Sequence, residues 1–75
     1  MTQKISENKR ERFTRLAVYR TNEVLKKLRV LANCANRSAY EYNEDEVNKI
    51  FTEIDRAIKA AKAKFYTPKH KEFKL

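Results

Sequence analysis

The sequence predicts an all-α protein: a two-helix antiparallel hairpin that pairs with a second copy as a four-helix bundle. Apolar residues recur every three or four positions along two segments, and the 75 residues contain no glycine and one proline. The third observation is size. A chain this short, with one cysteine and therefore no internal disulfide, buries too little apolar surface by itself and needs a partner.

The first helix is predicted over about residues 7–33, where no glycine or proline interrupts a run of good helix formers. Leu16, Leu25 and Ala32 widen its apolar face enough to pack against more than one neighbour. The face itself is formed by residues spaced three or four apart: Phe13, Ala17, Thr21, Val24, Leu28, Leu31 and Ala35.

The second helix is predicted over about residues 43–66. Asn43 is placed as its N-cap, with Glu46 three positions later to complete a capping box, and Tyr42 and Val47 are spaced for a hydrophobic staple. The helix stops before Pro68. Its apolar stripe consists of Val47, Ile50, Phe51, Ile54, Ile58, Ala61 and Phe65.

The segment 34–42 is predicted as the loop of the hairpin. Because it has no glycine, a left-handed residue at the end of the first helix would have to be Asn33 or Asn36. Cys34 is expected as a small buried side chain. Residues 67–75 carry three Lys and one Glu and are predicted to form a basic tail.

The composition also excludes several classes of function. Phosphate-binding loops, dinucleotide fingerprints and nucleophile elbows all need glycine. One Cys and one His cannot form a structural zinc site, and no nucleophile, base and orienting group stand together, so we expect no enzyme, metal or cofactor. The sequence has no leader-like or membrane-spanning apolar segment, which predicts a cytoplasmic protein.

Positive charge is concentrated in the first helix. The chain has a formal net charge of +8, and residues 1–33 hold nine Lys and Arg against three Glu, whereas residues 43–66 hold five charges of each sign. Steps of three and four place one polar stripe roughly opposite the apolar face. The stripe consists of Arg12, Arg15, Tyr19, Asn22, Lys26 and Arg29.

This stripe predicts a nucleic-acid-binding surface, since Arg and Lys can follow phosphates and Tyr19 can stack on a base. RNA is favoured over DNA as the partner. Arg37 and Tyr40 in the loop are further candidate contacts, and so is the basic tail. The alternative interpretation is a solvated outer face of a bundle. Tyr42 is favoured as the staple residue, whereas Tyr40 is equally suited to contacting a partner and to covering the end of the hairpin.

Other partners fit the same charges. An inhibitor or assembly factor that docks on an acidic protein patch is the main alternative. A subunit of a ribonucleoprotein is a third hypothesis. A helix lying on a membrane surface is a fourth, although a seam covered by another helix explains the apolar face more simply.

The predicted layout resembles the Rop family of plasmid copy-number regulators, dimers of short helical hairpins that bind paired RNA loops through their helix faces. The resemblance covers architecture and length; no sequence motif is shared, so no functional residue carries over. Short proteins from bacteria and their phages are similar along the run RLAVYRTNEVLKKLRVLANCANRSAYEYNEDEVNKIF. That similarity implies a prokaryotic or phage origin and assigns no activity.

Overall fold

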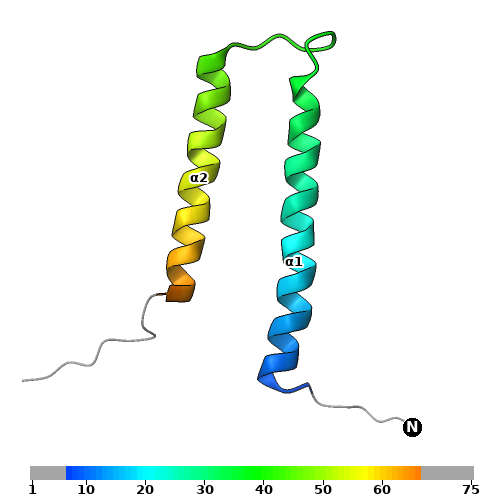
Figure 1. The fold of residues 1–75 in the computed structure, drawn as a ribbon, viewed down its shortest axis with the longest axis vertical. Helices are drawn as coiled ribbons and strands as arrows, with labels where there is room; N and C mark the ends of the chain where they lie inside the picture. The colour runs from blue at the N-terminus through cyan, green and yellow to red at the C-terminus, as the bar shows by residue number, and fades with distance from the viewer. Residues whose placement is uncertain (1–6, 67–75) are drawn as a thin grey trace, which may run out of the picture. The chain divides into compact units, whose positions relative to one another are not determined.

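The computed structural model describes residues 7–66, and all regular structure in that range is helical (Figure 1). Helix α1 spans Lys9–Ala32, the short 3₁₀ helix η1 spans Asn33–Ala35, and α2 spans Glu44–Tyr66. No strand occurs among the described residues, which confirms the all-α prediction. The chain divides after Tyr40 into one unit that holds α1 and η1 and another that holds α2.

A reciprocal pair of hydrogen bonds begins α1. The Glu11 backbone N–H donates to Asn8 Oδ1 over 2.7 Å, and the Asn8 N–H donates to Glu11 Oε1 over 3.4 Å. Together they form a capping box that satisfies two backbone donors left open at a helix start. The helix therefore begins at Lys9, two residues later than the expected start near Glu7.

The end of α1 differs from the prediction of a left-handed asparagine. Asn33 is right-handed (φ −63°, ψ −20°), Asn36 is extended (φ −69°, ψ 101°), and no described residue has a positive φ. The chain tightens into η1 instead, a common way to satisfy the last backbone groups of a helix.

Asn36 then turns the chain through its side chain. Its Oδ1 accepts the Ser38 N–H over 3.0 Å, and its carbonyl accepts the N–H groups of Ala39 and Tyr40 over 3.0 and 2.9 Å. An asparagine side chain that bonds two residues ahead reproduces a backbone turn, so no left-handed residue is needed.

The start of α2 confirms the predicted capping box. The Glu46 N–H donates to Asn43 Oδ1 over 2.8 Å, and the Asn43 N–H donates to Glu46 Oε1 over 3.0 Å. Tyr42 and Val47 are both half-buried, as a hydrophobic staple requires. Acidic residues occupy the first turn and Lys64 the last, matching the helix dipole.

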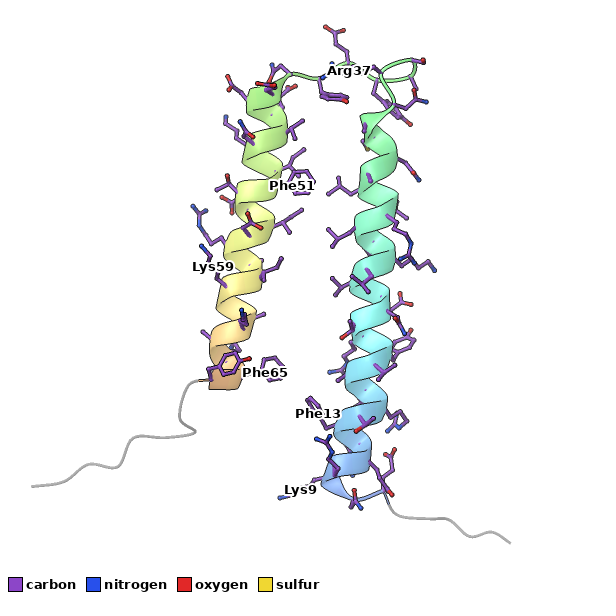
Figure 2. The ribbon with its side chains drawn as sticks, in the orientation of Figure 1. Lys9, Phe13, Arg37, Phe51, Lys59 and Phe65 are labelled. Carbon is purple, nitrogen blue, oxygen red and sulfur yellow. The ribbon has the colours of Figure 1, made fainter. Side chains whose placement is uncertain are left out.

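The apolar faces of both helices are accessible. None of residues 7–66 is buried, and Phe13, Phe51 and Phe65 are each about half exposed or more. Phe51 and Phe65 lie along one side of α2, and Lys59 projects from another (Figure 2). Cys34 is exposed, so the expectation of a buried thiol is wrong here: it stands in η1, where no described side chain covers it.

Replacing Asn43 by Ala should destabilise α2, because the Glu46 backbone N–H loses its acceptor, Asn43 Oδ1. The expected cost is about 1 kcal/mol in the free energy of unfolding, measured by circular dichroism during urea denaturation. Asn48→Ala is the matched control. This Asn lies inside α2, and there alanine should stabilise the helix by up to about 0.7 kcal/mol. Equal effects of the two changes would contradict a capping role.

Candidate nucleic-acid interface

The six residues of the predicted stripe lie along one face of α1. The helix is continuous from Lys9 to Ala32, so the three- and four-residue steps from Arg12 to Arg29 bring these side chains together over about 25 Å. Each is exposed, Tyr19 by 62%. We call this surface the α1 stripe: Arg12, Arg15, Tyr19, Asn22, Lys26 and Arg29.

The α1 stripe has cations at both ends and uncharged groups between them. Arg12 and Arg15 form the first cation pair and Lys26 and Arg29 the second. Eleven residue steps separate Arg15 from Lys26, which corresponds to about 16 Å along the helix. Tyr19 and Asn22 occupy this interval, so an aromatic ring and an amide lie between two positive ends.

An internal carboxylate occupies part of the first cation pair. Glu7, just before the N-cap, accepts two bonds from Arg15: Nε to Oε2 over 2.6 Å and Nη2 to Oε1 over 2.8 Å. The Glu7 side chain is 31% exposed and that of Arg15 is 59% exposed. This two-point geometry matches the planar fork of a guanidinium to a carboxylate.

The ion pair changes the acidity of both groups. The hydrogen bond from Arg15 lowers the pKa of Glu7 below its ordinary value; desolvation opposes this effect, and the charges of Arg15 and Arg12 add to it. The Glu7 bond and charge raise the pKa of Arg15. Sequence analysis missed this pair because the two residues stand eight positions apart, outside the spacings at which helical side chains meet.

The second cation pair is open. Within residues 7–66, neither Lys26 nor Arg29 forms an ion pair or side-chain hydrogen bond. On α2, Glu53 and Arg56 form an ion pair. The two ends of the α1 stripe therefore differ: one holds a carboxylate of the chain, and the other faces solvent.

The loop candidates lie apart from the α1 stripe. Arg37 and Tyr40 are exposed, and both follow Asn36 in the turn that it organises. Figure 2 shows Arg37 beyond the C-terminal end of α1. The stripe thus brings together six of the eight predicted contact residues. The basic tail, residues 67–75, lies outside the described residues.

No family model, curated protein or solved structure matches this chain. In the described part of the chain, no three His, Cys, Asp or Glu side chains are grouped to hold a metal ion. Neither described helix combines the length and apolar character that a membrane crossing needs. We therefore infer function from the arrangement of charge on α1.

The Glu7 carboxyl should titrate with a midpoint below its ordinary 4.5, as followed by carbon NMR of the side chain. Because its folded pKa is lowered, the ion pair stabilises the folded chain above about pH 4.5 and is lost as pH falls through the lowered pKa. Arg15→Gln should return the midpoint towards 4.5. An unchanged midpoint in that variant would show that Arg15 does not hold the carboxylate.

Proposed function

We propose that this chain is a small basic nucleic-acid-binding protein that uses the α1 stripe, with RNA favoured over DNA. The observation that carries the proposal is a continuous, exposed stripe that holds four cations, with Glu11 and Glu23 as the acidic residues of the same helix. The solvated face of a bundle is charged, but its charges can be of both signs. The α2 helix, with five charges of each sign, is such a surface.

The order of groups along the α1 stripe suits a single-stranded segment. Arginine forks and lysine bind backbone phosphates at the two cation pairs, and counterion release supplies much of the affinity. Between them, Tyr19 offers a ring for stacking on an unpaired base, and Asn22 a donor and an acceptor for a base edge. Each phosphate whose binding releases counterions contributes about −0.7 to the slope of log affinity against log salt.

The apolar faces support the bundle as the form in which α1 acts. The wide α1 face and the narrow α2 stripe both leave large side chains exposed in the single chain. We propose that the helices pair as an antiparallel hairpin and that two hairpins form a four-helix bundle. The α1 stripe, opposite the apolar face, then lies on the outside of each hairpin.

Lys26→Glu with Arg29→Glu should abolish binding to a short labelled single-stranded RNA, measured by fluorescence anisotropy across a salt series. The double change places two repulsive charges at the open cation pair. The matched control is Lys59→Glu with Lys62→Glu, which has the same net charge and spacing on α2 and should retain most of the affinity.

Equal losses of RNA affinity in the α1 double variant and its α2 control would show that only the net charge of the protein matters. If neither double variant loses RNA affinity, the α1 stripe is not part of the RNA interface. If cell proteins still co-purify with the chain after nuclease treatment, and the chain does not bind the labelled RNA, the acidic-protein alternative replaces the proposal.

Sedimentation equilibrium should give twice the 9.0 kDa mass of the chain. Ile54→Lys places a charge in the centre of the α2 apolar stripe and should reduce both the mass and the helicity, because the isolated helices lose their packing. Thr52→Lys, on the opposite side of α2, should leave both unchanged. A monomer with full helicity would contradict the bundle.

A further inference from the structure

We infer that Glu7 marks a phosphate subsite: Arg15 holds the chain's own carboxylate where a backbone phosphate of bound RNA lies, and RNA displaces it. This inference rests on the proposed function and names the point at which the nucleic acid is gripped at the N-terminal end of α1. It also assigns Glu7 as a residue that limits affinity.

The geometry of the ion pair is the first support. Arg15 binds Glu7 through Nε and Nη2 at 2.6 and 2.8 Å, a two-point contact that a phosphate with two oxygens can replace. The Arg12 charge also acts on the Glu7 carboxylate. One arginine fork of the α1 stripe therefore already holds an anion at a defined position.

The position of Glu7 in the chain is the second support. It precedes the N-cap Asn8, so its side chain takes no part in the capping box of α1, whose bonds join Asn8 and Glu11. Its carboxylate can leave Arg15 without breaking a helical hydrogen bond. By contrast, Glu53 and Arg56 pair at the ordinary three-residue helix spacing on α2.

Displacement has a measurable cost. Exposed ion pairs are weak, so competition from the Glu7 carboxylate should lower the RNA affinity by a factor of only about two to five. It also keeps counterions away from Arg15. Binding at that residue then exchanges one anion for another and adds little to the salt dependence.

The test compares Glu7→Gln with Glu23→Gln in the full chain. Both remove one negative charge from the unit that holds α1, but Glu23 forms no ion pair with a described residue. Single-stranded RNA should bind Glu7→Gln about two to five times more tightly than Glu23→Gln. The slope of log affinity against log salt should be steeper by about 0.7 in Glu7→Gln than in Glu23→Gln. In an Arg15→Gln background the two variants should bind equally.

A second probe separates this inference from the proposed function. Inorganic pyrophosphate should shift the Arg15 Nε–H resonance more strongly in Glu7→Gln than in Glu23→Gln, whether or not RNA binds. Equal RNA affinities and equal pyrophosphate shifts in the two variants would overturn the subsite. Pyrophosphate binding at Arg15 without RNA binding to any variant would keep the subsite and overturn the proposed function.

Discussion

Reciprocal capping bonds determine where both helices begin, and the rest of the structure depends on them. Asn8 with Glu11 and Asn43 with Glu46 each satisfy two backbone donors that a helix start leaves open. Because no described side chain is buried, order within each unit comes from backbone bonds and their caps. Helices held in this way are marginal in water, so the exposed apolar faces call for a covering surface.

The same cap connects helix formation to charge on α1. It holds Asn8 in an extended conformation (φ −84°, ψ 175°), so the chain leaves the helix at this point. Glu7, one residue earlier, bonds to Arg15 from outside the helix. The carboxylate thereby lies at one end of the α1 stripe. A surface that looks uniform by composition has a partly neutralised end and an open end.

Local rules predicted much of this structure, and their failures have physical reasons. The three- and four-residue apolar spacing identified both helices, and an asparagine followed three residues later by glutamate located the start of α2. The same pattern at Asn8 stands five residues before Phe13, where the apolar spacing of α1 begins, so that spacing does not point to it. Asn36 can turn the chain by a left-handed backbone or by its side chain, and sequence does not distinguish these two routes. The Glu7–Arg15 pair depends on the path of the chain before the helix, which no periodicity describes.

The order of residues along the α1 stripe is a stronger guide to the partner than the net charge of +8. An acidic protein patch would use the cations mainly to accelerate and orient association, and would take its affinity from anchors outside the α1 stripe, such as Tyr40. Tyr19 lies between the two cation pairs with 62% of its surface exposed, at the place where a nucleic acid held by phosphates on either side presents its bases. Stacking of a base on an aromatic ring adds affinity whatever the base sequence. The cations bind phosphates and add no affinity for the bases themselves. A ring between cations therefore favours a single-stranded nucleic acid as the proposed partner.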